Sequence, residues 1–419
     1  MNIVIVSPLL PFPLSSGGAQ AQFNMIDRMR HNHNITFIFP QNGYNSLKAM
    51  RELTVLWPEV KLVCYSYAAQ MLNPTFVWQK AVRAFNLRFR ADSPAFQQSR
   101  VLDPYGFSLD ARFGDFLRKH IRLAKADVVE VDFYQFLDVV DLLPKDIPAV
   151  FVHHEIRFIR NERLLADFPQ SPELQHRKEM VRRHEIAQLN KFQYILTLTA
   201  TDAQMLRENG CQSPVGVSPA AVNAEVMPYK AWNGTVCFLG GYAHFPNQEG
   251  VDWFLNKVCP LLDPAVKESL QFNIVGGGWP GSYEKACGIR SHRLGFVDKL
   301  SDALHGSILI VPILSGSGMR MKILEAAAMS VPMLTTTVGV EGLDFQNGHS
   351  CLVADTPEAF AQALQRLISD EALRRDLSSE AQKIFRQQYS VEALTKCRQA
   401  FFEEVLSKIK KESHVRSHT

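Results

Sequence analysis

Short apolar runs recur along the chain, and many of them are followed by a loop and a segment with helical periodicity. The first run, Asn2–Val6, is followed by a helical pattern over Ala19–Met29 and by a second run, Ile35–Phe39. Because buried strands of parallel sheets are continuous apolar runs, this order predicts a βαβ unit. Further predicted strands in the first half are Val60–Cys64, Asp127–Val131, Ala149–His153 and Tyr194–Thr199.

The second half of the chain repeats this pattern. Its predicted strands, with helical segments between them, are Thr235–Leu239, Phe272–Val275, Ser307–Pro312, Met333–Thr337 and Ser350–Val353. Pro214–Asn233 lies between the halves and has prolines, small residues and little periodicity, which is typical of a linker. The predicted fold class is therefore α/β, with two Rossmann-like, doubly wound parallel sheets in separate domains.

These patterns divide the 419 residues into four segments. We expect an N-terminal, acceptor-binding domain over residues 1–215, a linker over 216–233 and a C-terminal, nucleotide-sugar-binding domain over 234–388. Residues 389–419 form a predicted C-terminal helix with a basic tail, which we expect to pack back toward the N-terminal domain. The total length agrees with two domains of roughly 100–200 residues each.

Composition excludes several classes of protein. The contents of 46% hydrophobic and 21% charged residues are those of a folded globular protein, and a net charge of +3 does not favour nucleic acid as a partner. Seven scattered cysteines without a CxxC pair predict reduced thiols. The N-terminus lacks the basic start of a signal peptide, and no run approaches the roughly 20 apolar residues of a spanning helix. We therefore expect a cytoplasmic protein whose membrane contact, if any, is peripheral on the inner face.

The loops after strands carry the candidate chemistry, because ligands of open parallel sheets bind at the carboxyl ends of strands. Gly17 and Gly18 precede a helix and could present N–H groups to a phosphate, or form an ordinary connection. His153 and His154 could bind a sugar hydroxyl or move a proton, or be structural hydrogen-bonding groups. No third ligand is spaced for a metal. The turn Gly276–Gly278 is interpreted as structural.

The loop and helix after Ser307–Pro312 are the most informative part of the sequence. A helix is predicted to start near Met319, and its N–H groups together with Arg320 and Lys322 could gather the negative charge of a diphosphate. Glu325 could accept hydrogen bonds from a ribose diol. Acids are the usual charges in a first turn, so two cations there indicate an anionic ligand; the alternative is a solvated basic turn.

The stretch Gly316–Leu343 resembles the donor-binding helix and the following strand and loop of family 4 of the retaining GT-B glycosyltransferases. Other matching pieces are Phe238–Asn247, Ile274–Gly278 and Leu294–Val297, and the resemblance covers nearly the whole chain. It implies two Rossmann-like domains with an interdomain cleft, a UDP- or GDP-sugar as donor and no metal or other cofactor. It also implies transfer, with retention, to a glycan, lipid-linked glycan or other acceptor in cell-surface polysaccharide or glycoconjugate synthesis.

The resemblance also assigns roles to single residues. It places His153 beside the transferred sugar, with His154 as a competitor, and Glu325 on the ribose as the second glutamate of the E-x7-E motif. Ser317 stands where the family has the first glutamate. The other residues that it assigns to the donor site are Gly17, Gly18, Gly240, Gly241, Phe296, Val297, Gly318 and Met319. The basic pair that many members carry after the first C-terminal strand is absent, so Arg320 and Lys322 are expected to replace it.

The acceptor side is less defined. Pro74–Lys125 has ten Lys or Arg against four Asp, and Trp78, Val82, Phe85 and Phe89 fall in it at helical spacing. Such a helix could rest on an anionic membrane surface, or its aromatic residues could be core and its cations solvated.

Rival functions keep the fold and change the reaction. The chain could be a GT-B epimerase or a phosphorylase, or bind a sugar nucleotide or glycan without catalysis. A dehydrogenase is disfavoured, because Pro8–Gly18 lacks the GxGxxG fingerprint of dinucleotide folds.

Overall fold

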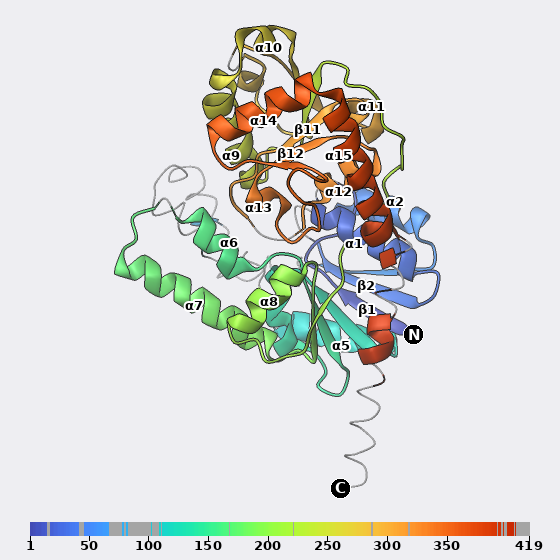
Figure 1. Cartoon of the computed structure of the whole chain (residues 1–419). Coiled ribbons are helices and arrows are strands. Elements are labelled where there is room, and N and C mark those ends of the chain that lie inside the picture. The colour runs from blue at the N-terminus through green and yellow to red at the C-terminus, as the bar shows by residue number, and fades with distance from the viewer. Residues whose placement is uncertain are drawn as a thin grey trace. The chain divides into compact units, whose positions relative to one another are not determined.

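The structure, a computed structural model, contains two compact units, each with one parallel sheet (Figure 1). Unit 1 consists of Met1–Pro13, Met25–Ser218 and Gln399–Thr419, and unit 2 of Leu14–Asn24 and Pro219–Arg398. The residues that the structure describes are 1–14, 17–41, 46–66, 78, 81–82, 102, 109, 111–166, 168–220, 222–285, 288–316, 319–391, 393–394, 397, 400–405 and 407.

The sheet of unit 1 has seven parallel strands in the order β3-β2-β1-β4-β5-β6-β7. Their bounds are β1 Asn2–Val6, β2 Asn34–Pro40, β3 Lys61–Tyr65, β4 Val128–Asp132, β5 Ala149–His153, β6 Tyr194–Thr197 and β7 Val215–Val217. The central strands β1, β4 and β5 are almost entirely buried, which explains why each is a continuous apolar run.

The sheet of unit 2 has six parallel strands in the order β10-β9-β8-β11-β12-β13. Their bounds are β8 Thr235–Leu239, β9 Gln271–Val275, β10 Arg290–Gly295, β11 Ile308–Val311, β12 Met333–Thr335 and β13 Leu352–Val353. Together the two sheets confirm the predicted fold class.

Helices connect these strands. Those of unit 1, with α1 shared between the units, are α1 Gly17–Met29, α2 Leu47–Leu56, α5 Ala111–Leu123, the 3-10 helix η2 Tyr134–Leu142, α6 Arg157–Leu164, α7 Pro172–Leu189 and α8 Ala200–Glu208. Those of unit 2 are α9 Phe245–Trp253, η3 Phe254–Val258, η4 Cys259–Leu261, α10 Pro264–Ser269, η5 Gly281–Lys285, α11 Leu300–Leu304, α12 Met321–Ala328, α13 Thr337–Val340, α14 Pro357–Ser369, α15 Glu371–Ile384 and η6 Phe385–Tyr389.

Helix starts follow local side-chain chemistry. Ser171 accepts a hydrogen bond from the backbone N–H of Leu174, and Pro172 occupies the first turn of α7. Thr356 starts α14 in the same way. Each such cap is worth about 0.5–2 kcal/mol of stability.

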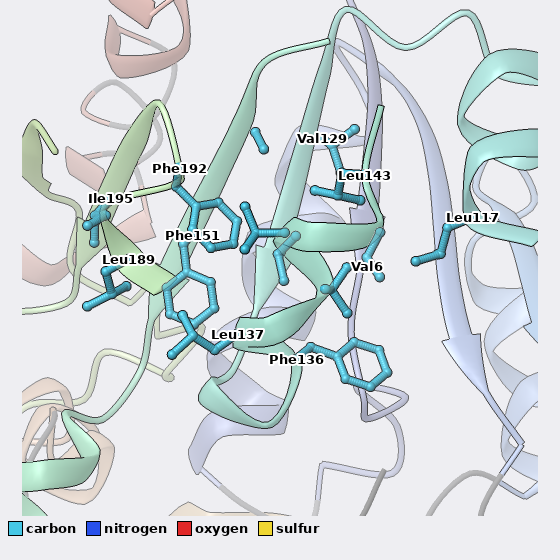
Figure 2. Packing of buried hydrophobic residues seen from close by; sticks show 14 of the residues in the cluster. Val6, Leu117, Val129, Phe136, Leu137, Leu143, Phe151, Leu189, Phe192 and Ile195 are labelled. Atoms are coloured by element: carbon cyan, nitrogen blue, oxygen red, sulfur yellow. The ribbon is translucent and has the colours of Figure 1, made fainter. Parts of the chain in front are cut away.

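The core of unit 1 joins strands and helices through buried apolar side chains (Figure 2). Val6, Val129 and Phe151 come from the sheet, Leu117 comes from α5 and Phe136 from η2, and all five are fully buried. Burying a side chain of this kind contributes about 1.5–3 kcal/mol. This packing fixes the carboxyl ends of β1, β4 and β5, where the candidate site residues of unit 1 begin.

Two strands were not predicted. β7 extends the first sheet to Val217, two residues into the segment expected to be linker, and β10 covers a mostly polar stretch at the edge of the second sheet. Among the helices that the structure describes, none has the length and apolar character needed to cross a bilayer.

Candidate functional site

Both sheets reverse their strand order at one point, and the candidate loops follow the strands at these points. In unit 1 the order turns between β1 and β4, and in unit 2 it turns between β8 and β11. Ligands of open parallel sheets bind beside the carboxyl ends of the strands that flank such a point. The loop before α1, the residues after β4, and the loops after β8 and β11 therefore hold the positions where ligand chemistry is expected.

Lys322 lies at the start of α12, after β11. The helix begins at Met321 with Arg320 as its N-cap residue, slightly later than the predicted start near Met319. Nζ of Lys322 donates to Oδ1 of Asn247 at 3.0 Å and lies 4.4 Å from the ring centroid of Phe238. Burial, followed by the positive charge of Arg320, lowers the pKa of Lys322 to about 7.

Glu325 lies one turn beyond Lys322 on α12 and is 7% exposed. Burial raises the pKa of its carboxyl group to about 7, and two neighbours act in the opposite direction. One is Gln20, in the part of α1 that belongs to unit 2, whose Nε2 donates to Oε1 of Glu325 at 2.6 Å. The other is the charge of Lys322. α12 thus presents a cation and a carboxylate, both buried and both with strongly shifted pKa values, as functional sites often do.

Gly240 and Gly241 follow β8, and the structure gives Gly240 a packing reason to be glycine. A Cβ atom at Gly240 would lie 2.5 Å from Nδ2 of Asn247, and the carbonyl of Gly240 accepts from Nε1 of Trp279 at 2.8 Å. Gly276, after β9, faces the same carbonyl so closely that a Cβ atom there would collide with it. The structural interpretation of the Gly276–Gly278 turn agrees with this contact.

The remaining predicted donor residues are spread over several loops. Phe296 follows β10 and is 70% exposed, with Val297 half-buried beside it. Gly17 is the first residue of α1, and a Cβ atom there would lie 3.3 Å from Cγ of Met321. Gly18 is the second residue of α1, and Met319 is half-buried just before α12. Ser317 and Gly318 lie outside the described residues.

His153 is held inside unit 1. Its side chain is fully buried, and Nε2 lies 2.9 Å from Oε1 of Glu185 on α7. Both oxygens of Glu185 also accept hydrogen bonds from the first N–H groups of α6, those of Arg157 and Phe158, at 3.0 Å. His153 and Glu185 therefore fix the start of α6 against β5, which is the contact pattern of a structural histidine.

His154 has a different environment. Its Nε2 atom lies 2.8 Å from Oδ1 of Asp132, the last residue of β4, and its side chain is 11% exposed. The ring of Phe133 stacks on the imidazole with a centroid distance of 4.1 Å. Phe133 adopts a φ of 64°, a left-handed conformation that a bulky residue rarely adopts without a local reason. The stacked, carboxylate-bound His154 is the histidine of the pair that reaches the surface.

The sequence interpretation missed four residues that make these contacts: Asp132, Phe133, Gln20 and Asn247. Asp132 and Phe133 directly follow an apolar run, so their position after a strand was an available signal. Gln20 and Asn247 are uncharged residues of helices, and only their tertiary contacts single them out.

Two other expectations concern metal and membrane. Within the described ranges, no group of three or more His, Cys, Asp or Glu residues could hold a metal ion. Trp78 and Val82 are helical and exposed, by 70% and 39%, so neither is a core residue. Phe85 and Phe89, with most of the basic residues around them, lie outside the described residues.

Comparison with solved structures defines the class of fold. Sucrose-phosphate synthase from Thermosynechococcus elongatus matches with a TM-score of 0.67 and 12% identity over 97% of this chain and 99% of that one. HepE from Anabaena in complex with UDP matches with a TM-score of 0.65 and 13% identity over 96% and 100%. TarM from S. aureus, in complex with fondaparinux, α-GlcNAc-glycerol and UDP, matches with a TM-score of 0.64 and 10% identity over 97% and 100%. The chain has the GT-B architecture.

Sequence comparison narrows the class for the C-terminal half. Residues 233–370, which include β8 and α12, match the model of the family described as Glycosyl transferases group 1. An uncharacterised 44.6 kDa protein in the cps region of Klebsiella pneumoniae is 29% identical over 142 residues, which are 31% of this chain. The match spans 36% of the length of that relative.

Proposed function

We propose that this protein is a retaining glycosyltransferase that binds a nucleoside diphosphate sugar in unit 2. It transfers the sugar to a hydroxyl group of a glycan, a lipid-linked glycan or a related acceptor in the synthesis of cell-surface polysaccharide. The observation that carries the proposal is the pair of buried, oppositely charged side chains on α12, Lys322 and Glu325, beside the switch point of the second sheet.

The comparisons support this proposal. The Glycosyl transferases group 1 match covers the residues from β8 through α12. HepE has been solved with UDP, with UDP and glucose, and with UDP-glucose, so a protein of this fold binds a nucleotide sugar. The relative in the cps region favours a role in surface polysaccharide. We propose UDP-sugars first and GDP-sugars second as donors.

Charge stabilisation and positioning provide the chemistry in this proposal. Lys322, Arg320 and the N–H groups at the start of α12 stabilise the charge that develops on the departing diphosphate. The acceptor oxygen bonds to the anomeric carbon on the face that the nucleotide leaves, while the bond from that carbon to the phosphate oxygen breaks. The departing phosphate takes the proton of the acceptor hydroxyl. The products are the glycoside and the nucleoside diphosphate, and no carboxylate nucleophile or metal takes part.

In unit 1, we assign the contact with the transferred sugar to His154 rather than to His153. His154 has one ring nitrogen at Asp132 and reaches the surface, whereas His153 is fully buried and bound to Glu185. Asp132 and the stacked ring of Phe133 orient the imidazole, as second groups commonly do for functional histidines.

A thermal-shift screen of UDP, GDP, ADP, CMP and dTDP tests the donor site. We expect one nucleoside diphosphate to stabilise the wild type, by about 2.7 kcal/mol at a hundred times its Kd, because it binds the folded state. Glu325→Ala should lose this shift, and Glu268→Ala, which removes an exposed carboxylate of unit 2, should keep it. If no nucleotide shifts the wild type, or Glu325→Ala responds fully, the assignment of the donor site is wrong.

Product analysis separates glycosyl transfer from the rival activities. We expect slow release of the nucleoside diphosphate from the matching sugar nucleotide in water, and faster release with an acceptor. An epimerase would change the sugar without releasing the nucleotide, a phosphorylase would depend on inorganic phosphate, and a binding protein would leave the donor intact. NMR of the fresh product gives the anomeric configuration, and inversion would contradict the proposed retention.

Exposure of Trp78 and Val82 favours a second, peripheral contact with an anionic membrane surface, which we propose for the acceptor side. We expect the double variant Trp78→Ala, Val82→Ala to lose co-sedimentation with phosphatidylglycerol vesicles. The control Leu47→Ala, Val55→Ala removes two other exposed apolar side chains of unit 1 and should sediment as the wild type does. Equal sedimentation of both double variants would remove the support for this contact.

A further inference from the structure

Two side chains from other elements of unit 2 hold the ammonium group of Lys322. The amide oxygen of Asn247, on α9, accepts its hydrogen bond at 3.0 Å, and the ring face of Phe238, on β8, lies 4.4 Å away. Within the part of the chain that the structure describes, Asn247 is the one hydrogen-bond acceptor of this group. An ammonium group has three N–H donors, so the cation keeps capacity for an anionic ligand.

The orientation of Asn247 is fixed by its own contacts. Nδ2 donates to the carbonyl of Gly241 at 2.9 Å, so Oδ1 must face Lys322. The side chain is 7% exposed and lies against Gly240, where a Cβ atom would be only 2.5 Å from Nδ2. A buried amide locked on both sides is a rigid support for the longer, flexible lysine side chain.

The charged groups around Lys322 explain its protonation. Arg320 repels a proton on Lys322 and Glu325 attracts one, and burial outweighs both. α9 presents the neutral Asn247 at this contact, and its Glu249 accepts a hydrogen bond from Oγ of Ser315 at 2.5 Å. β8 contributes the apolar ring of Phe238. Without a ligand, the pKa of Lys322 is therefore about 7, far below the value of a solvated lysine.

We propose that Asn247 and Phe238 are positioning residues that hold Lys322 over the carboxyl end of β8, where it binds the diphosphate of the donor. The loop Gly241–Asn247 after β8 contains no Lys or Arg. A cation from α12 thus occupies the position at which that loop would have to supply one. This inference rests on the proposed donor site and names how its main cation is held.

A measurable consequence is proton uptake on binding. Above pH 7 the amine of the free protein is mostly neutral, and a bound diphosphate favours the charged form and raises the pKa of Lys322. Binding therefore takes up about one proton, and the association constant falls by up to about tenfold per pH unit above 7. The phosphates of UDP and GDP, with a second pKa near 6, are already ionised at pH 8 and above.

Calorimetric titration with UDP and GDP at pH 8.5, in two buffers of different ionisation enthalpy, counts these protons. We expect close to one proton per molecule for the wild type and none for Lys322→Met. Asn247→Asp keeps the acceptor but adds a negative charge that raises the pKa of Lys322 in the free protein. Its proton uptake should be less than half that of the wild type, and its loss of affinity with pH should begin at higher pH.

Asn247→Leu tests positioning apart from charge. Removing the acceptor should weaken UDP binding at least about tenfold, yet leave uridine binding, followed by NMR titration, unchanged. An equal loss for uridine would mean that the loop is merely disrupted, and it would overturn the inference. So would a wild type that binds a nucleotide through Glu325 without taking up a proton, or an Asn247→Asp variant with the wild-type pH profile. If neither nucleotide binds, the proposed donor site fails and this inference fails with it.

Discussion

Substituting the two adjacent histidines one at a time should separate a structural role from a functional one. His153→Ala removes a fully buried ring and leaves Glu185, 3% exposed, without its imidazole partner. Breaking a buried pair of this kind costs about 3–5 kcal/mol. In a domain of this size each kcal/mol lowers Tm by about 2–4 °C, so we expect a drop of about 6–15 °C.

His154→Ala should give the reverse pattern. Its half-buried ring makes one hydrogen bond, to Asp132, and one stacking contact, with Phe133. Their loss costs about 1–2 kcal/mol. If His154 contacts the reacting sugar, turnover should fall by about 100-fold or more.

Urea unfolding followed by tryptophan fluorescence and release of nucleoside diphosphate measure the two effects on the same samples. His153→Gln, which retains a donor for Glu185, should recover part of the stability, and His292→Ala, at an exposed position in unit 2, is the control for both assays. The reasoning is refuted if His153→Ala unfolds at the wild-type midpoint and loses turnover, or if His154→Ala turns over normally.

Further predictions concern pH and the glycine turn of unit 2. The raised pKa of Glu325 means that its contribution to stability is lost as pH rises from 4.5 to about 7, and the lowered pKa of Lys322 means that its contribution is lost as pH falls from 10.5 to about 7. Urea midpoints from pH 5 to 10 should show a flatter lower limb in Glu325→Gln and a flatter upper limb in Lys322→Met; unchanged limbs would contradict these pKa directions. Gly276→Ala should lower the free energy of unfolding by about 1–3 kcal/mol, since its Cβ collides with the carbonyl of Gly240. Gly277→Ala, which meets nothing within 4 Å, should unfold close to the wild type, and equal midpoints for the two variants would contradict this contact.

The central strands were predictable because burial on both faces leaves a continuous apolar run in the sequence. β5 and β8 have the bounds that their apolar runs predicted, Ala149–His153 and Thr235–Leu239. The edge strand β10 was missed for the opposite reason. Of its six residues only Ser291 is buried, so Arg290–Gly295 has no apolar signature, and pairing with β9 alone makes it a strand.

The candidate site was predictable only where chemistry is local. Lys322 and Glu325 share one helix, so their spacing in the sequence already indicates that they lie near one another. The contact between His154 and Asp132 depends on β4 and β5 being neighbours in the sheet. Likewise, the hold of Asn247 on Lys322 joins residues 75 positions apart. Pairings of this kind are set by strand order and helix packing, which a single sequence does not express.

The close approach of Gly240 and Gly276 has a genetic consequence. Every amino-acid replacement reachable from a glycine codon introduces a Cβ atom, and at either position that atom collides with the neighbouring loop. The loops after β8 and β9 therefore cannot accumulate substitutions independently at these two points. In a library of random variants we expect both codons to stay almost unchanged among functional clones, while the codon of Gly277, between them and the solvent-facing turn, drifts freely.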